Sequence, residues 1–150
     1  MDKKIDFLFR MHEIQMERGR HTEEQRASAT NFTILIAFGI VTFFQTQTDI
    51  VVQIILSATV IFLGMYGALI CYKFYERYMH HTHEAITFLN EIDSLAEGIG
   101  LMPIIEKSER FHEKEFSPKW LIRFRLYSAW IGINILITVV GIILLVYTLS

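Results

Sequence analysis

The pattern of hydrophobic and polar positions is dominated by two long stretches without charge, residues 27–48 and residues 50–72. Asp49, in the short polar turn that joins them, is the only charged residue between Arg26 and Lys73. Each stretch holds more than 20 residues, and a membrane-spanning helix needs about 20. The pattern therefore predicts a transmembrane helical hairpin with an external turn at residue 49.

A third uncharged stretch covers residues 126–150. Of all residues, 52% are hydrophobic and 20% are charged, and the charges form blocks instead of alternating with apolar positions. Soluble proteins bury their core residues periodically, whereas this segregation is typical of membrane proteins. We predict an all-α membrane protein with three transmembrane helices, at residues 27–48, 50–72 and 126–150.

The charged segments predict helices outside the membrane. Residues 1–26 are expected to form an amphipathic helix whose apolar stripe contains Phe7, Met11 and Ile14, with Leu8 beside them. The second span is expected to continue through residues 73–97, with an apolar stripe of Tyr78, Ala85, Leu89 and Ile92. These two arms should pair as a cytosolic helical stalk that extends the hairpin. Residues 98–125 are expected to form a cytosolic linker and interfacial helix, because glycines and Pro103 interrupt the second arm and a new helix begins at Ser117 and Pro118.

The positions of the basic residues predict the orientation of the chain. All 14 Lys and Arg lie in three blocks, at residues 3–26, 73–77 and 107–125. Basic residues are retained on the cytoplasmic side of a membrane. We therefore expect the N-terminus inside and Ser150 outside.

The predicted spans contain polar residues but no Asp, Glu, Lys, Arg or His. Ion-coupled transporters and proton relays usually need such groups, so we do not expect a transporter of that kind. The polar residues allow two interpretations. In the first they reinforce helix packing, and in the second they line a water-filled path in an oligomer. The residues concerned are Asn31, Thr42, Gln45, Gln53 and Asn134.

Small residues mark predicted helix contacts within the spans. Gly64 and Ala68 form a small-x-x-x-small pattern in the second span, and Gly132 and Gly141 mark corresponding positions in the third. Small side chains let helix backbones approach closely in a membrane. Cys71 is the only cysteine, which excludes an intramolecular disulfide, and we expect it to pack as a small apolar residue.

A cluster of titratable residues follows the second span and forms a possible cytosolic sensing face, made of His80, Glu84, Lys73 and Arg77. Of the neighbouring residues His80, His81, His83 and Glu84, only His80 and Glu84 are expected to share a helix face, which Glu76 extends. A zinc site needs three or four ligands, so we favour a solvated polar face opposite the apolar stripe and expect no metal. Lys73 and Arg77 could also join Arg123 and Arg125 in an anion or lipid-headgroup site, although retention of topology explains them equally well.

The sequence argues against several functional classes. It contains no Gly-rich phosphate loop, nucleophile elbow, HExxH or CxxC motif, so we expect neither an enzyme nor a cofactor. The net charge of −2 gives no support to nucleic-acid binding.

The architecture resembles that of small bacterial membrane effectors of the SLATT kind, which occur with nucleotide-signalled anti-phage systems. Those proteins have a cytosolic helix, a two-span hairpin with a very short external turn, and a long helix that continues inward, an order that residues 5–93 share. Residues 64–93, with the run at 73–77 followed by His80 and Ala85, also resemble an uncharacterised bacterial membrane family. The third span departs from the two-span pattern. The resemblance implies a bacterial inner-membrane location, homo-oligomerisation, a cytosolic protein or nucleotide signal, and membrane disruption on activation.

Two functional hypotheses follow. The first is an oligomeric membrane effector or channel that dissipates ion gradients, for which the resemblance implies a role in antiviral defence. The second is a non-conducting, membrane-anchored subunit whose stalk recruits a cytosolic partner. Both explain the stalk, but only the first needs the polar residues of the spans to face a common axis.

Overall fold

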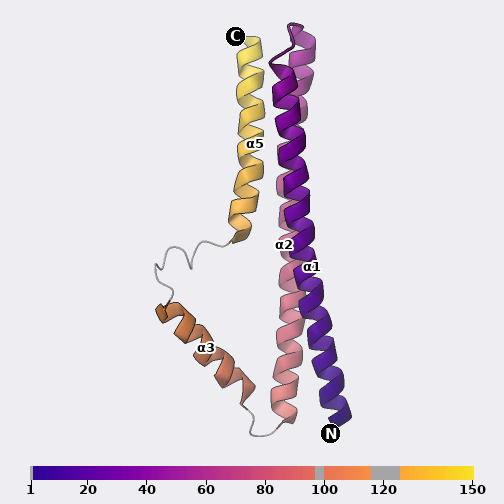
Figure 1. Cartoon of the computed structure of the whole chain (residues 1–150), viewed down its shortest axis with the longest axis vertical. Coiled ribbons are helices and arrows are strands. Elements are labelled where there is room, and N and C mark those ends of the chain that lie inside the picture. The colour runs from indigo at the N-terminus through magenta and orange to yellow at the C-terminus, as the bar shows by residue number, and fades with distance from the viewer. Residues whose placement is uncertain (1, 97–99, 116–125) are drawn as a thin grey trace. The chain divides into compact units, whose positions relative to one another are not determined.

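The computed structural model describes residues 2–96, 100–115 and 126–150, and these residues form four α-helices (Figure 1). The helices are α1 (Asp2–Phe44), α2 (Ile50–Leu95), α3 (Leu101–Glu115) and α5 (Leu126–Leu149). Three of them, α1, α2 and α5, are long and apolar enough to cross a membrane. The prediction of an all-α membrane protein with three spans is therefore confirmed.

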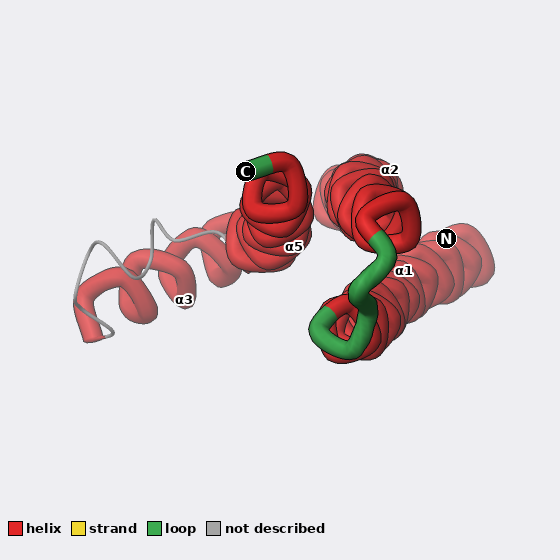
Figure 2. Tube along the Cα trace, turned by 90° about the horizontal axis from the view of Figure 1, so that it is seen from above, coloured by secondary structure: helices red, strands yellow, loops and turns green. Residues whose placement is uncertain are grey.

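Helices α1 and α2 form the predicted hairpin, and a short turn joins them (Figure 2). Helix α1 ends at Phe44, so residues 45–48 belong to the turn rather than to the first span. The Asp49 carboxylate accepts a hydrogen bond of 2.8 Å from the backbone N–H of Val51. Asp49 thus caps the N-terminus of α2, a position at which a short acidic side chain satisfies free N–H groups.

The chain divides into two units. The described parts of Met1–Glu23 and Glu76–Arg125 form one, which we call the charged unit. Glu24–Tyr75 and Leu126–Ser150 form the other, which we call the apolar unit. Helices α1 and α2 each pass from one unit into the other without a break.

In the charged unit, α1 packs antiparallel to α2. On α2 the predicted stripe is confirmed, since Ala85 and Ile92 are almost completely buried. On α1 the prediction is confirmed only in part: Leu8 is buried and Met11 is half-buried, whereas Phe7 and Ile14 are 59% and 40% exposed. The polar residues Gln15 and Thr22 continue the Leu8 face at seven-residue spacing, which a search for apolar periodicity cannot detect.

In the apolar unit, most of the buried side chains are small or polar, although Phe44 is also buried, and many large apolar side chains are exposed. The buried positions include Ala37, Ser57 and Val60. Phe38, Phe62 and Leu136 point outward and are largely exposed. This distribution suits helices surrounded by lipid, whose outer surface needs no polar cover.

Helix α3 begins where a change of chain direction requires glycine. Gly100 has a φ of 62°, a conformation that costs glycine little. The backbone N–H of Leu101 then donates a 2.6 Å hydrogen bond to the Asp93 carboxylate, near the end of α2. The helix start expected at Ser117 and Pro118, and the basic residues Arg123 and Arg125, lie outside the described residues.

Candidate functional site

Three polar side chains from three helices meet inside the apolar unit. Thr30 comes from α1, Cys71 from α2 and Asn134 from α5, and each is at most 1% exposed. The Thr30 Oγ1 atom lies 3.1 Å from Cys71 Sγ, and Asn134 Nδ2 donates to the same sulfur at 3.5 Å. We call this cluster the polar junction.

The direction of the hydrogen bonds follows from the donors available. Thr30 donates its single hydroxyl proton to the carbonyl of Arg26 at 3.1 Å, so it accepts a proton from the Cys71 thiol. The Asn134 amide donates one proton to the Trp130 carbonyl at 2.9 Å and the other to Cys71. The result is one hydrogen-bonded chain that runs from α5 through α2 to α1.

Asn134 Oδ1 is buried and has no hydrogen-bond partner among the described residues. It points at Gly67, where an added Cβ would collide with it. Because Gly67 has no side chain, the Asn134 side-chain oxygen occupies the space where a Cβ of residue 67 would lie. A substitution at Gly67 must displace Asn134 and so disturb the polar junction.

The backbones of α2 and α5 also approach closely next to Asn134, toward the C-terminus of α5. A Cβ on Gly64 would lie 2.6 Å from the Thr138 nitrogen, and a Cβ on Gly141 would lie 2.7 Å from the Ile61 nitrogen. Both positions therefore require glycine at this separation. Such close approach lets polar groups on neighbouring membrane helices meet.

The four residues expected at helix contacts lie in different surroundings. Gly64 and Gly141 lie between α2 and α5, and Ala68 is half-buried. Gly132 is exposed, and among the described residues nothing outside its own helix lies within 4 Å of a Cβ placed there. Sequence reasoning missed Gly67, although it lies three residues after Gly64 on the same helix.

Within one chain, the described residues do not bring the five predicted path residues together. Asn31, Thr42 and Gln45 are exposed, and the Thr42 hydroxyl donates to the carbonyl of Phe38. The Gln53 amide donates to the carbonyl of Gln47 at 2.7 Å, at the external turn. Asn134 lies in the polar junction instead. A path between subunits stays a prediction.

The charged unit contains a second set of polar contacts, between α1 and α2. His12 Nδ1 lies 3.1 Å from the Ala85 carbonyl, and His81 Nδ1 lies 2.9 Å from Gln15 Oε1. Both acceptors are oxygens that carry no proton, so each histidine donates through its Nδ1–H. His81 thus belongs to the helix interface, which sequence reasoning missed.

The predicted sensing face is only partly brought together. Glu84 lies 3.6 Å from His80 and 3.7 Å from His81, so the expectation that only His80 shares its face is wrong. The i, i+3 step to His81 also brings two side chains together on a helix. Arg77 is exposed in the charged unit, whereas Lys73 is exposed in the apolar unit. Among the described residues no three His, Cys, Asp or Glu side chains are placed to hold a metal ion.

The three long apolar helices make the chain a candidate multi-span helical membrane protein. No known protein family, curated protein or solved structure matches the chain. A more specific function must therefore be argued from the residues themselves.

Proposed function

We propose that the chain is a homo-oligomeric membrane effector that perturbs the bilayer when its charged unit receives a signal. The three candidate spans support a function in the membrane. The three basic blocks support an N-terminus in the cytoplasm and a C-terminus outside. The proposal includes no catalytic step, and the resemblance to SLATT-type effectors favours the bacterial inner membrane and anti-phage defence.

The observation that carries the proposal is the continuity of α1 and α2. Each helix contributes residues to both units, and neither contains proline. A helix without a break resists local bending, because each turn is fixed by backbone hydrogen bonds. A change in how α1 pairs with α2 in the charged unit is therefore passed along both helices into the apolar unit.

The charged unit has contacts that a signal could exchange. The His12–Ala85 and Gln15–His81 hydrogen bonds join its two long helices, and each involves a half-buried or buried polar side chain. A cytosolic protein or a nucleotide that binds here would compete for these donors and acceptors. Such competition supplies the differential binding that a ligand needs to shift an equilibrium.

The apolar unit offers polar groups without charge. In an opened oligomer, Thr42, Gln45 and Gln53 would face water, and separation of α5 from α2 would also expose Asn134. Polar groups of this kind can line a weakly selective path. Ion gradients would then dissipate without the charged relay residues of a transporter.

The experiment is ion flux from liposomes that contain the purified protein, with and without its candidate signal. Gln53→Leu should lower the flux at least several-fold while the oligomer stays intact. Thr59→Val is the matched control, because Thr59 is an exposed residue of α2 that bonds only to its own helix. Wild-type protein that never conducts, even with its genetic partners, would eliminate the channel.

The orientation needs its own test. A reporter fused after Ser150 should be active only when it folds outside the cytoplasm. Activity of a strictly cytoplasmic reporter at the same position would refute the three-span topology.

The second candidate function is a non-conducting anchor for a cytosolic partner. The exposure of large apolar side chains in the charged unit, such as Phe7 and Ile14, favours it. A partner that is recruited to the membrane by the wild-type chain and lost with Phe7→Ser, in the absence of any flux, would support this function.

A further inference from the structure

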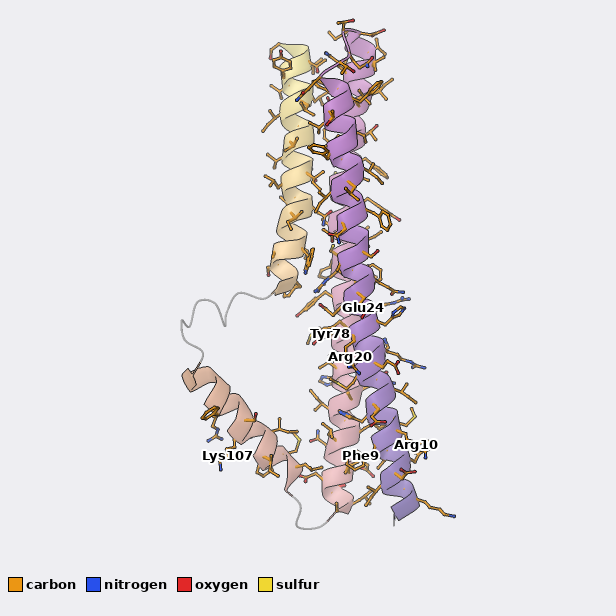
Figure 3. The ribbon with its side chains drawn as sticks, viewed as in Figure 1. Phe9, Arg10, Arg20, Glu24, Tyr78 and Lys107 are labelled. Atoms are coloured by element: carbon orange, nitrogen blue, oxygen red, sulfur yellow. The ribbon has the colours of Figure 1, made fainter. Side chains whose placement is uncertain are left out.

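Four of the large apolar side chains that the charged unit exposes lie at regular spacing. Phe9 and Met16 lie on α1, and Met79 and Ile86 lie on α2, each 43–44% exposed. Each pair is seven residues apart, which is two helical turns. Charged residues surround these positions, so lipid does not account for their exposure. In Figure 3, Phe9 points to the side of α1 nearer α2, whereas Arg10 points away.

The two pairs lie on the same side of the helix pair. Phe9 and Met16 each follow a buried residue of the α1 interface, Leu8 and Gln15. Ile86 likewise follows the buried Ala85, and Met79 follows Tyr78, which packs beside Gly19. On each helix, the residue that follows a contact residue is rotated away from the partner helix. Because both helices are right-handed and antiparallel, this rotation places the following residues of both helices on the same side of the pair.

The two pairs also match in height along the helices. Gln15 contacts His81, and Gly19 lies against Tyr78, so Met16 and Met79 are at the same level. His12 contacts Ala85, so Phe9 and Ile86 lie within about one turn of each other. The four side chains form one continuous surface, which we call the stalk patch.

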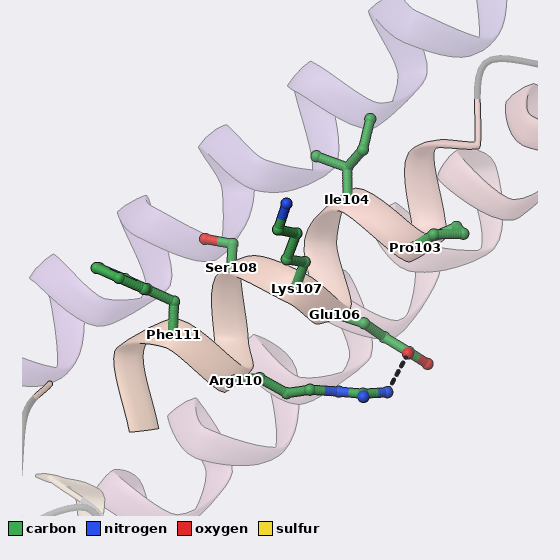
Figure 4. A pocket seen from close by; sticks show the side chains of 7 residues that line it. All are labelled: Pro103, Ile104, Glu106, Lys107, Ser108, Arg110 and Phe111. Carbon is green, nitrogen blue, oxygen red and sulfur yellow. Dashed lines mark hydrogen bonds and ion pairs between the residues drawn. The ribbon is translucent and has the colours of Figure 1, made fainter. Parts of the chain in front are cut away.

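Helix α3 has a complementary face. Its exposed apolar residues are Ile104, Ile105 and Phe111, and Ser108 lies between them on the same face at helical spacing. An open hollow of about 750 Å3 is lined by Ile104, Ser108 and Phe111 of this face and also by polar residues such as Lys107 and Glu106 (Figure 4). On the other side, Arg110 and Glu106 form an ion pair of 2.9 Å. The helix therefore presents an uncovered apolar face and a polar face suited to water.

The attachment of α3 lies on the side of the stalk patch. Asp93, which accepts the hydrogen bond from Leu101, follows the buried Ile92 by one residue. It thus continues the line of Met79 and Ile86 at the same seven-residue spacing. Gly100, with its positive φ, provides a turn at the base of α3.

We propose that α3 is a hinged flap that closes over the stalk patch. With Leu101 held at Asp93, a closed α3 runs antiparallel to α2, and both helices rise by the same 1.5 Å per residue. Ser108 then reaches the level of Ile86, and Phe111 lies between the levels of Ile86 and Met79. The apolar face of α3 covers the patch while Glu106 and Arg110 stay in water. This closure does not depend on ion conduction.

Cross-linking of cysteine pairs tests the closed state in the full-length protein in membranes. Cys71→Ser removes the only native thiol, and Ile86→Cys with Ser108→Cys provides the test pair. A short bis-maleimide should link this pair within one chain at least several times faster than the pair Ile86→Cys with Arg110→Cys. Arg110 is the matched control because it lies two residues away on the opposite face.

A second measurement tests the flap if the double-cysteine variant fails to fold. A water-soluble maleimide should label the single variant Ile86→Cys at a low rate. Phe111→Asp, which places a charge on the closing face, should raise that rate several-fold, whereas Arg110→Gln should not. Equal linkage of test and control pairs, or labelling that is indifferent to Phe111→Asp, would overturn the flap. Linked products of twice the chain mass from Ile86→Cys alone would assign the patch to a second copy instead.

Discussion

The hairpin of α1 and α2 is built in two chemically different ways along its length. In the charged unit the interface combines apolar residues such as Leu8 and Ile92 with long polar side chains, Gln15 and His81. In the apolar unit the interface uses small side chains, with Thr30 and Cys71 in direct contact. The spacing of inward positions is similar in both, so the difference lies in the side chains alone.

The surrounding solvent explains the difference. In water, burial of apolar area drives helix pairing, so the charged unit can use large side chains and tolerate polar ones that bond across the interface. In lipid that driving force is absent, and close packing and interhelical hydrogen bonds must hold the helices. In the apolar unit, stability should therefore depend on the glycines and on the polar junction. Surface charge should contribute little to stability in either unit.

The largest effect is expected at Gly67. Gly67→Leu forces a side chain into Asn134 and should lower the free energy of unfolding by about 3 kcal/mol, at the upper end of overpacking costs. Titration with a denaturing detergent, followed by circular dichroism, measures the change. Gly132→Leu is the control, since among the described residues the space beside Gly132 is open. Equal stability of the two variants would contradict the close approach of α2 and α5.

The same reasoning applies to Gly64, which faces the Thr138 backbone. Gly64→Leu should separate α2 from α5 and disrupt assembly. Survival of both the detergent-extracted oligomer and its function would mean that the essential contact lies elsewhere.

The sequence predicted the helices well and the contacts between them less well. Uncharged stretches and blocks of charge are local features, so the hairpin and the third span could be read directly. The α1 interface was predicted only in part, because Phe7 and Ile14 are more hydrophobic than Gln15, and hydrophobicity alone favours them. Asn134 was among the residues considered for polar helix packing, but its meeting with Thr30 and Cys71 was missed, because the three residues are far apart in sequence and no local pattern reports which residues meet.

A smaller effect is expected at Cys71. Cys71→Ala removes the acceptor for Asn134 and the donor to Thr30, and should destabilise the apolar unit by roughly 2 kcal/mol through lost hydrogen bonds and a small cavity. A double-mutant cycle with Thr30→Val should give a coupling of about 0.6 kcal/mol, the average for such bonds in membranes. A cycle between Thr59→Val and Cys71→Ala should give none. A coupling of zero between Thr30→Val and Cys71→Ala would show that the hydrogen bond between these side chains does not stabilise the protein.

In the charged unit, Gln15→Ala should cost about 1 kcal/mol, the usual net value of one hydrogen bond. It deletes the acceptor for His81 and leaves the His81 ring, which is 20% exposed, able to reach water. Pulsed hydrogen exchange at residues 78–92 measures the local loss. Exchange that increases instead around the polar junction would show that the two halves of the hairpin do not differ in the way described.

The smallest effect is expected for the ion pair between Lys4 and Glu91. Its atoms lie 3.0 Å apart, but the side chains are 59% and 50% exposed, so water screens their attraction. Exposed pairs contribute about 0.2–1 kcal/mol, and many contribute nothing measurable. Lys4→Gln should therefore change the free energy of unfolding by less than about 0.5 kcal/mol, with even less effect at high salt. Arg10→Gln, which removes the exposed pair with Asp6 within α1, is the control for a loss of charge that joins no two helices. A cost above about 1 kcal/mol for Lys4→Gln alone would mean that charge holds the two helices of the charged unit together. Their pairing would then respond to ionic strength rather than to the fit of their buried side chains.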